Sequence, residues 1–227
     1  MFIKKPGLNK PLAGLLKYIF INDQKYREKL ESYGGKYGYD SKEVKELWDT
    51  INKQDSVNIA QVTDIINKYG WLGPDAIGEE GSSTLFLVIQ HADIKTQEKY
   101  LPLMEEAVKK GNAYARDLAL LEDRVALAHG KKQIYGSQVV RDLKTGKYII
   151  QPIEDEGSVN KRRESVGLEP IEQYVKHWGI DYKPGMSNFE NCNNDSQKSA
   201  NVWLWVCIIA SGVLIIVFLV YKYRRSV

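Results

Sequence analysis

The sequence predicts an α+β fold: a predominantly helical domain with one β-hairpin, followed by a single transmembrane helix at the C-terminus. Three observations support this fold class. Apolar residues recur at helical spacing through most of the chain, alternate along two short stretches after residue 132, and form one unbroken run near the end. The composition, with 43% hydrophobic and 27% charged residues, is typical of a globular chain, and 227 residues suffice for one ordinary domain with extra segments.

The first helices are predicted from polar residues that suit helix starts. Asp40, followed three residues later by Glu43, forms a capping arrangement before an amphipathic stretch. Asn58 with Gln61 repeats the arrangement, and Gly70 supplies a stop signal for the stretch that follows. We therefore expect two successive helices over this part of the chain.

Three more helices are expected in the middle of the sequence. Residues 82–92 predict a mostly buried helix, although the apolar run 85–89 alone would equally suit a strand. Residues 95–110 predict a helix in which Pro102 forces a kink or a new first turn. Residues 116–129 carry apolar side chains along one side and predict the third helix.

The helical period then gives way to alternation. The stretches "QIYGSQVV" and "KYIIQPI" flank "RDLKTG", which predicts a β-hairpin with Gly146 at its turn. Ser158 is expected to cap the first of two short helices, over residues 159–167 and 169–178.

The run "VWLWVCIIASGVLIIVFLVY", residues 202–221, contains no charged residue. Twenty helical residues at about 1.5 Å each span about 30 Å, the thickness of the hydrocarbon core of a bilayer. Trp203 and Trp205 at one end, and Tyr221 at the other, are typical interfacial aromatics. The sequence therefore predicts a single-pass membrane protein whose C-terminal anchor has the lipid bilayer as its partner.

Two signals disagree on the orientation of this span. The basic tail, residues 222–227, favours a cytoplasmic C-terminus by the positive-inside tendency. That placement requires export of the long N-terminal part, but Lys17 interrupts the first apolar stretch and no small-residue cleavage site follows it, so no convincing signal peptide is present. A tail-anchored protein whose domain faces the cytoplasm is the simpler expectation.

The segment ahead of the span has the composition of a linker. Residues 183–201 are small, polar and almost free of aliphatic side chains, so we expect a flexible tether. The chain then divides into an N-terminal helical segment (1–57), an α+β domain (58–182), the linker (183–201), the transmembrane helix (202–221) and the basic tail (222–227).

Charge and cysteine content exclude several classes of protein. Lys222, Arg224 and Arg225 account for the whole formal net charge of +3, so the rest of the chain is neutral and no nucleic-acid partner is expected. Cys192 and Cys207 lie in the linker and in the apolar run. The main body therefore has no internal disulfide, no cysteine zinc site and no thiol nucleophile.

The first candidate site follows the apolar run 85–89. On a helix Gln90, Asp93 and Gln97 share one face, whereas His91 points about 200° away from Asp93 at about 100° per residue. Two alternatives remain open. Either the helix ends early and Asp93 caps the next one, or His91 works with a partner from another segment.

Two further groups of polar residues follow. Asp123 and Arg124 sit among aliphatic positions, where a buried ion pair is a common structural solution. Gln133, Tyr135 and Gln138 lie on a predicted strand, where their side chains either line a pocket or pair with neighbours.

The last group lies at a predicted helix start. Asp155 precedes a helix that carries Asn160, Arg162 and Arg163. Backbone N–H groups at a helix start, with arginines nearby, suit a phosphate or a carboxylate, and a solvated face with surface ion pairs explains the pattern equally well.

No complete catalytic motif is present. The sequence contains no HExxH, no GxSxG, no P-loop and no GxGxxG before a helix. The spacing of the histidine and the acidic residues does not require a metal, so none is predicted, and no cofactor can be named.

Several sequence blocks resemble an uncharacterised, mainly bacterial family of unknown function. They are "YGWLG", "FLVIQHAD", "YLPLMEEAVKKG", "LALLEDRVALAHGKKQIYGSQ" and "QPIEDEGSVNKRRESVGLEPIEQYV", and the resemblance runs from about residue 58 to 182. The resemblance implies a domain identity and no particular activity. It places within the family's motif blocks most of the polar residues named above: His91, Asp93, Gln97, Asp123, Arg124, Gln133, Tyr135, Gln138, Asp155, Asn160, Arg162 and Arg163.

Two functions are consistent with these residues. The first is a membrane-anchored binding, sensor or adaptor domain with a polar pocket for a small or anionic ligand. The alternative is a membrane-anchored hydrolase in which His91 is the general acid or base, Asp93 or Asp123 orients it, and arginines hold an anionic substrate. An enzyme needs His91 within hydrogen-bond reach of a partner, whereas a purely structural network would bury His91 with every polar atom satisfied.

Overall fold

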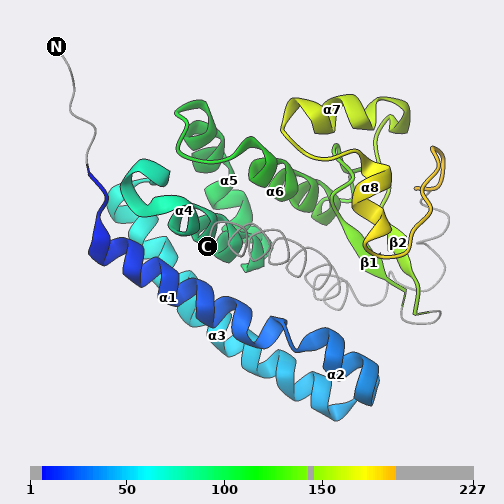
Figure 1. Ribbon diagram of the computed structural model, residues 1–227, viewed down its shortest axis with the longest axis horizontal. Helices are drawn as coiled ribbons and strands as arrows, with labels where there is room; N and C mark the ends of the chain where they lie inside the picture. Colours follow the sequence, from blue (N-terminus) through cyan, green and yellow to red (C-terminus); the bar gives the residue numbers. More distant parts are fainter. Residues whose placement is uncertain (1–6, 143–145, 188–227) are drawn as a thin grey trace, which may run out of the picture. The chain divides into compact units, whose positions relative to one another are not determined.

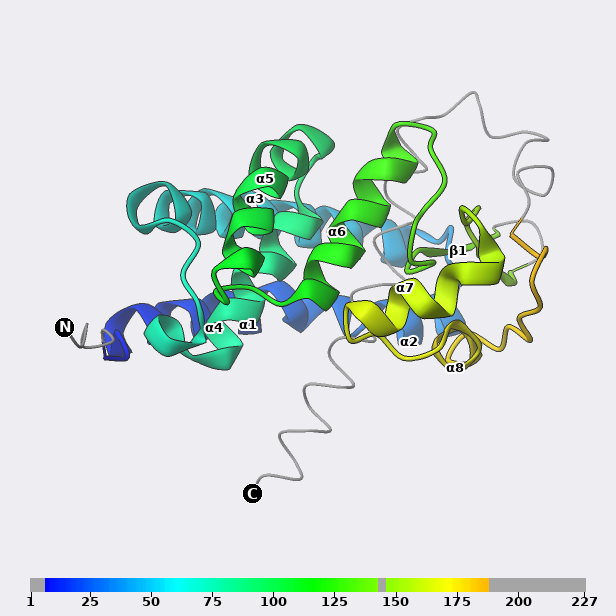
Figure 2. The ribbon, with the colours of Figure 1, turned by 90° about the horizontal axis from the view of Figure 1, so that it is seen from above.

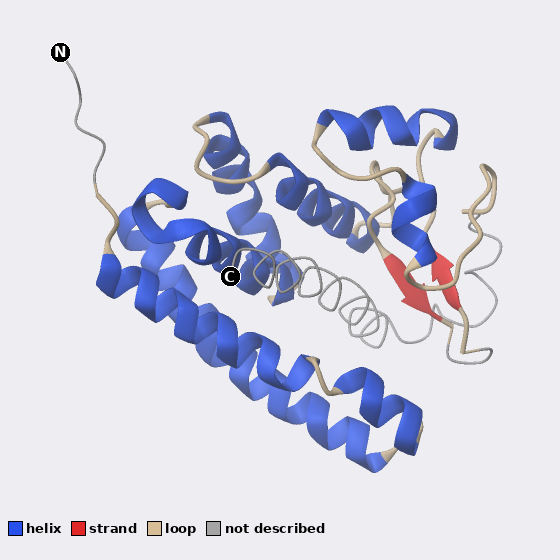
Figure 3. Ribbon diagram, viewed as in Figure 1, coloured by secondary structure: helices blue, strands red, loops and turns tan. Residues whose placement is uncertain are grey.

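The computed structural model describes residues 7–142 and 146–187, and the chain divides into two compact units, Met1–Leu118 and Ala119–Val227. We call them the N-terminal and the C-terminal unit. Helices make up nearly all of the first unit, and the second adds one small sheet (Figures 1 and 3). The elements in order are α1 (Lys10–Arg27), α2 (Leu30–Tyr37), α3 (Lys42–Tyr69), α4 (Pro74–His91), α5 (Ile94–Lys109), α6 (Ala115–Ala128), β1 (Val139–Arg141), β2 (Tyr148–Ile150), the 3-10 turn η1 (Glu156–Ser158), α7 (Val159–Ser165) and α8 (Ile171–Lys176).

The predicted α+β class, mainly helical with one hairpin, is confirmed for the part of the chain that the structure describes. The predicted transmembrane helix over residues 202–221 lies outside the described residues. Among the helices that are described, none combines the length and the apolar character needed to cross a membrane.

The core of the N-terminal unit is built from α1, α3 and α4, which pack against one another. Along α1 the buried positions include Leu12, Leu16 and Ile19, and the same face continues through Asp23 and Arg27. In the second half of α1, ionisable side chains thus occupy the inward-facing positions, because these positions recur at the helical period. Figure 2 shows α1 at the edge of the unit, next to α4.

Helix α3 corrects one sequence-based expectation. The prediction of two helices, the second beginning at Asn58, is wrong, because one helix runs without a break over 28 residues. Its N-cap is Ser41, whose hydroxyl accepts the N–H of Val44 at 3.2 Å. The Asn58 side chain is buried within the helix, and its oxygen accepts a hydrogen bond from the Gln54 amide, one turn earlier, at 3.0 Å.

The prediction of a helix rather than a strand over the apolar run 85–89 is confirmed by α4. Every residue of this helix from Gly81 to His91 is buried, so it forms the centre of the unit. A Cβ at Gly81 would lie 3.3 Å from Leu16 Cδ1, which shows how closely α1 and α4 approach each other. The helix ends where Ala92 adopts an extended conformation, with ψ 172°.

The C-terminal unit contains the predicted hairpin in a short form. β1 and β2 pair antiparallel with Val139 opposite Ile150. The two short helices are also present, and Ser158 is the N-cap residue of α7 as predicted, although its side chain makes no capping hydrogen bond and the 3-10 turn η1 precedes the helix. The buried core of the unit consists of Val139, Ile150, Ile153, Val159, Ile171, Val175 and Tyr182.

A single carboxylate holds the last described residues to the C-terminal unit. Glu156 accepts hydrogen bonds from the Tyr182 hydroxyl and the Gly185 N–H, both at 2.7 Å, and from the Ser187 hydroxyl at 2.5 Å. The Ser187 hydroxyl in turn accepts the N–H of Ile153 at 2.9 Å. The first five residues of the expected linker, 183–187, therefore end in contacts with the folded unit.

Gly136 offers a test of packing in the C-terminal unit. It has φ 68°, and an added Cβ would lie 2.5 Å from Ile171 Cδ1 and 2.8 Å from Ile153 Cδ1. Gly136→Ala should lower the free energy of unfolding by about 2–4 kcal/mol, through backbone strain and overpacking together. The measurement is urea unfolding of the full chain followed by circular dichroism.

Gly130→Ala is the matched control, because Gly130 has φ 69° and no atom within 4 Å of the added Cβ. It should show the strain alone, about 1–2 kcal/mol. Equal losses of unfolding free energy for the two variants would mean that the core around Gly136 accommodates the added methyl group without an energetic penalty.

Candidate functional site

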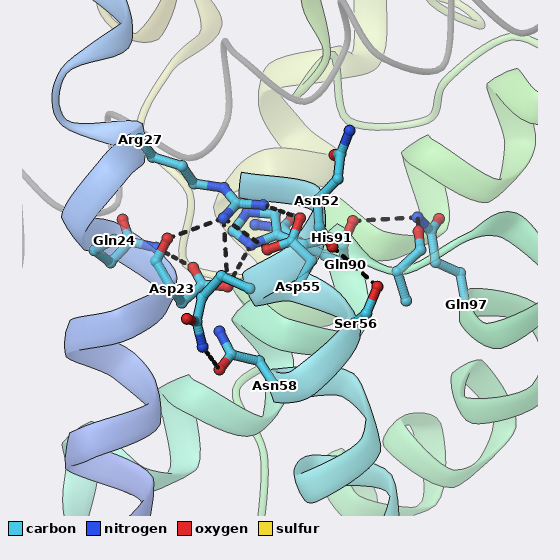
Figure 4. Close-up of polar contacts among 12 residues, drawn as sticks. Asp23, Gln24, Arg27, Asn52, Asp55, Ser56, Asn58, Gln90, His91 and Gln97 are labelled. Carbon is cyan, nitrogen blue, oxygen red and sulfur yellow. Dashed lines mark hydrogen bonds and ion pairs between the residues drawn. The ribbon is translucent and has the colours of Figure 1, made fainter. Parts of the chain in front are cut away.

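Four ionisable side chains from three helices meet inside the N-terminal unit (Figure 4). Asp23 and Arg27 come from α1, Asp55 from α3, and His91 is the last residue of α4. All four residues are buried, and we call them the His91 cluster. Their side chains are 1–3% exposed, except that of Asp55, which is 11% exposed and gives the cluster its contact with solvent.

Two ion-pair contacts organise the cluster. The Arg27 guanidinium donates to both oxygens of Asp55, at 2.9 and 2.7 Å, in a bidentate pair. The same guanidinium donates to the backbone carbonyl of Asp23 at 2.9 Å and lies 3.6 Å from its carboxylate. His91 Nδ1 lies 3.0 Å from Asp23 Oδ1. Asp23 thus links the arginine to the histidine.

The protonation states follow from burial and from these neighbours. Burial pushes the pKa of Asp23 upward, but its contacts with His91 and Arg27 outweigh burial and hold that pKa below its usual value. Burial, with the charge of Arg27, lowers the pKa of His91, although Asp23 partly opposes the shift. His91 is therefore neutral near pH 7, and the cluster carries one net negative charge.

The histidine tautomer follows from its partner. An ionised carboxylate only accepts hydrogen bonds, so Nδ1 of His91 carries the proton that Asp23 accepts. Nε2 then presents its lone pair, and this buried atom has no hydrogen-bond partner among the residues that the structure describes. The pair has the arrangement in which a carboxylate orients an imidazole for work as a base or a ligand.

Four buried amide side chains surround the cluster (Figure 4). Gln24 donates to Asp23, and Gln97 donates to the backbone carbonyls of Gln90 and Ala92 at 3.1 and 2.8 Å. Among the described residues, eleven buried side-chain atoms have no hydrogen-bond partner, and seven of them belong to the cluster or these amides. The seven are Gln24 Oε1, Arg27 Nε, Asn58 Nδ2, Gln90 Oε1 and Nε2, His91 Nε2 and Gln97 Oε1.

The structure realises both alternatives considered for the "QHAD" stretch. The helix ends at His91, and the Asp93 side chain caps α5 by accepting the N–H of Thr96 at 2.8 Å. His91 also has a partner from another segment, namely Asp23. Gln90 and Gln97 lie near His91, whereas Asp93 is exposed.

Asp123 lies in the C-terminal unit and makes a different set of contacts. Its buried carboxylate accepts the backbone N–H groups of Ile134, Tyr135 and Ser137 at 2.6, 3.0 and 2.9 Å. Burial raises the pKa of Asp123, and these three donors oppose the rise. Neither Asp93 nor Asp123 orients His91; the carboxylate in that position is Asp23.

Gln133 and Gln138 flank the loop residues that bind Asp123, and they hydrogen-bond to each other and to neighbouring carbonyls. Gln133 donates to the carbonyls of Gln138 and Gln151, at 3.2 and 2.6 Å, and accepts the Gln138 N–H at 2.8 Å. Gln138 donates to the carbonyl of Leu120 on α6 at 3.3 Å. Tyr135 is partly buried, and burial together with Glu122 raises the pKa of its hydroxyl to about 12.

The two adjacent arginines donate to carbonyls of this loop. Arg162 Nε donates to Ile134 O and Arg163 Nη1 to Tyr135 O, both at 2.8 Å. Arg162 also lies 3.7 Å from the exposed carboxylate of Asp155.

Three other contacts complete the set expected from the sequence. The Asn160 side chain accepts the Ile171 N–H at 2.8 Å and donates to Glu172, so it joins α7 to α8. Arg124 is buried on α6. The predicted ligand-binding residues of the C-terminal unit are thus engaged mainly with one another and with the backbone.

The comparisons with known proteins give one match. A model of the family described as "Family of unknown function (DUF6624)" matches residues 14–183. The chain belongs to this family. The matched range covers nearly all of α1 and continues to the last described segment, so the DUF6624 domain includes the N-terminal helices that the sequence resemblance left out. No curated protein and no solved structure matches the chain.

Three of the four members of the DUF6624 domain's His91 cluster were not predicted from the sequence. Asp23, Arg27 and Asp55 stand at the core positions of amphipathic helices, where an apolar residue is the rule. A polar residue at such a position is the signal that would have singled them out.

Asp23, Asp55 and His91 also form a possible metal-ligand set, because one ligand atom from each lies within 4.8 Å of the others. Carboxylates and imidazole suit zinc or manganese. However, Arg27 already binds both oxygens of Asp55, and a divalent ion would have to share this small buried volume with the guanidinium. The donor set of the DUF6624 domain therefore fits a divalent metal poorly.

The lowered pKa of His91 predicts a pH dependence of stability in this DUF6624 domain. Between the folded pKa and the unfolded value of about 6.5, the unfolded state binds a proton that the native state does not. The free energy of unfolding should therefore fall as the pH drops below about 6.5, by at most about 1.4 kcal/mol per pH unit. His91→Gln should remove this component, as measured by urea unfolding between pH 5 and 7.

The comparison uses the difference between wild type and variant at each pH. Burial raises the pKa of Asp117 to about 7, with the opposite effect on stability, but that contribution is common to both proteins. Nitrogen NMR of the His91 ring gives an independent readout. An Nε2–H tautomer, or an imidazolium at pH 7, would contradict the assignment.

Proposed function

We propose that the chain is a membrane-anchored binding protein of the sensor or adaptor type, and that the His91 cluster with its surrounding amides is the ligand site. The supporting observation is the concentration around that cluster of seven buried polar atoms that have no hydrogen-bond partner in the described part of the chain. Native proteins leave only a few such atoms per hundred residues, because each costs about 1–3 kcal/mol. A network that served the fold alone would have its polar atoms satisfied.

The polar atoms indicate the chemistry of the ligand. The cluster carries one net negative charge, and four of the seven atoms are acceptors: Gln24 Oε1, Gln90 Oε1, Gln97 Oε1 and His91 Nε2. A small neutral or singly positive ligand with N–H or O–H donors would satisfy them. The charge favours such a ligand over the anionic one suggested by the arginines, since Arg162 and Arg163 donate to backbone carbonyls.

Membrane anchoring is the second part of the proposal and is supported by the sequence. Residues 202–221 are apolar, uncharged and long enough to span a bilayer. A tail anchor of this kind would place the domain on the cytoplasmic side. The ligand site would then bind a molecule present in the cytoplasm close to the membrane.

A thermal-shift experiment tests the ligand site. The full chain, kept in a mild detergent, is melted with ethanolamine, methylguanidinium or glycerol as probes, and with acetate and phosphate as anionic comparisons. A probe at a hundred times its dissociation constant stabilises by about 2.7 kcal/mol, which corresponds to a rise in Tm of several degrees. The donor probes should raise the Tm of the wild type. They should raise the Tm of Asp55→Asn by less, or not at all.

Asp49→Asn is the matched control, because Asp49 lies on the same helix and is exposed. It should respond like wild type. If Asp55→Asn is too unstable to melt cooperatively, His91→Gln takes its place. A wild-type Tm that no donor probe moves, with no retained ligand in native mass spectrometry, would overturn the ligand site.

The Asp23–His91 geometry supports a second candidate, a hydrolase. With Asp23 holding Nδ1–H, the Nε2 of His91 would take a proton from a water that attacks an ester carbonyl or phosphorus. The proton would then pass to the leaving oxygen as that bond breaks.

This candidate predicts turnover of p-nitrophenyl acetate or p-nitrophenyl phosphate. The rate should rise with pH through the lowered pKa of His91 and then level off, because the neutral imidazole is the base. His91→Gln should lower it by about 10²–10⁴-fold. His177→Gln removes an exposed imidazole and controls for nonspecific hydrolysis. Equal rates for wild type and His91→Gln would exclude the hydrolase.

A further inference from the structure

The outward face of α1 is apolar. Leu15, Tyr18 and Ile21 follow one another at three-residue spacing and are 38%, 60% and 51% exposed. Tyr18 and Ile21 lie opposite the buried positions Leu16 and Ile19, and Leu15 lies at the boundary between the two sides of the helix. The helix is therefore apolar on two sides, and only the inner side packs within the unit.

The charged side chains of α1 beside this face are mainly positive. Lys10, Lys17 and Lys25 are exposed on the same helix. From residue 7 to 22 the chain has no acidic residue, and Asp23 is buried and paired. Lys17 has one acidic neighbour from another element, Glu80, at 3.9 Å, and both side chains are about half exposed. An apolar strip flanked by lysines is the composition of a helix that lies on an anionic lipid surface.

The length of chain outside the structure supports this partner. Fourteen residues, 188–201, separate the last described residue from the apolar run 202–221. A flexible linker of that length has an end-to-end distance of about 20 Å. If the run is anchored in a bilayer, as the proposed function states, the domain is held at an effective millimolar concentration near the lipid surface. A face of modest intrinsic affinity is then sufficient.

We propose that the outer face of α1, formed by Leu15, Tyr18 and Ile21 with the flanking lysines, contacts the surface of an anionic bilayer. The apolar side chains enter the boundary between headgroups and acyl chains. Each lysine near the surface adds attraction that salt weakens. The contact rests on the proposed anchoring for its strength, and the test separates the two.

A matched pair of labelling sites provides the test. Ile21 on α1 and Val57 on α3 are 51% and 52% exposed. In a full chain carrying Cys192→Ser and Cys207→Ser, Ile21→Cys and Val57→Cys each receive an environment-sensitive fluorophore. The proteins are mixed with vesicles of phosphatidylcholine alone or with about 30% phosphatidylserine, typical of an anionic leaflet. Flotation measures attachment, and quenching by spin-labelled lipids measures depth.

With phosphatidylserine, the label at Ile21 should be quenched at least several-fold more than the label at Val57, and high salt should reduce the difference. Tyr18→Glu should abolish it, whereas Asp49→Asn should leave it intact. If the protein floats with both vesicle types and quenching is equal at the two sites, the membrane anchor would be supported. The proposed contact of the α1 face with lipid would be overturned.

Three other outcomes would also distinguish the lipid contact of the α1 face from the anchor. Flotation only with phosphatidylserine, with the Ile21 signal, would support the face and overturn the anchor. Flotation with neither vesicle type would overturn both. A change at Ile21 that depends on protein concentration and not on lipid would assign the face to a second copy of the chain and overturn the bilayer contact.

Discussion

The buried guanidinium of Arg27 constrains the N-terminal unit more than any other group. It holds both oxygens of Asp55 on α3 and the carbonyl of Asp23 on α1, while Asp23 reaches His91 on α4. A buried cation tolerates the interior only with its carboxylates in place, and removing one partner of such a pair costs about 3–5 kcal/mol. One connected set of ion pairs and hydrogen bonds therefore joins the three helices.

The C-terminal unit uses polar side chains for a related purpose. Its hairpin has only three residues in each strand, so its ladder supplies few hydrogen bonds. The loop before β1 is held instead by Asp123, which accepts its N–H groups, and by Arg162 and Arg163, which donate to its carbonyls. The polar side chains of the C-terminal unit thus bind mainly backbone groups, whereas in the N-terminal unit most of the buried polar atoms without partners in the described residues gather around one charged centre.

Helical periodicity was enough to predict most helices and the burial of the run before His91, and alternation with a turn glycine was enough to predict the hairpin, because those features depend on residues close in sequence. The partner of His91 depends on tertiary packing, since Asp23 lies 68 positions away and nothing local relates the two. Asn58 misled for the opposite reason: as a residue favoured at helix starts it predicted a boundary, but its side chain is satisfied by Gln54 inside a continuous helix. Polar residues on the core stripe carried the missing information.

Glu156 gives the C-terminal unit a defined point of departure for the chain. Because its carboxylate holds Tyr182, Gly185 and Ser187, mechanical tension arriving from the C-terminal side would load this clasp before it reached the hydrophobic core. The several hydrogen bonds meet at one side chain, so they would share a pulling force and yield together. Peeling of the last described segment from the unit would then be an abrupt event with a threshold.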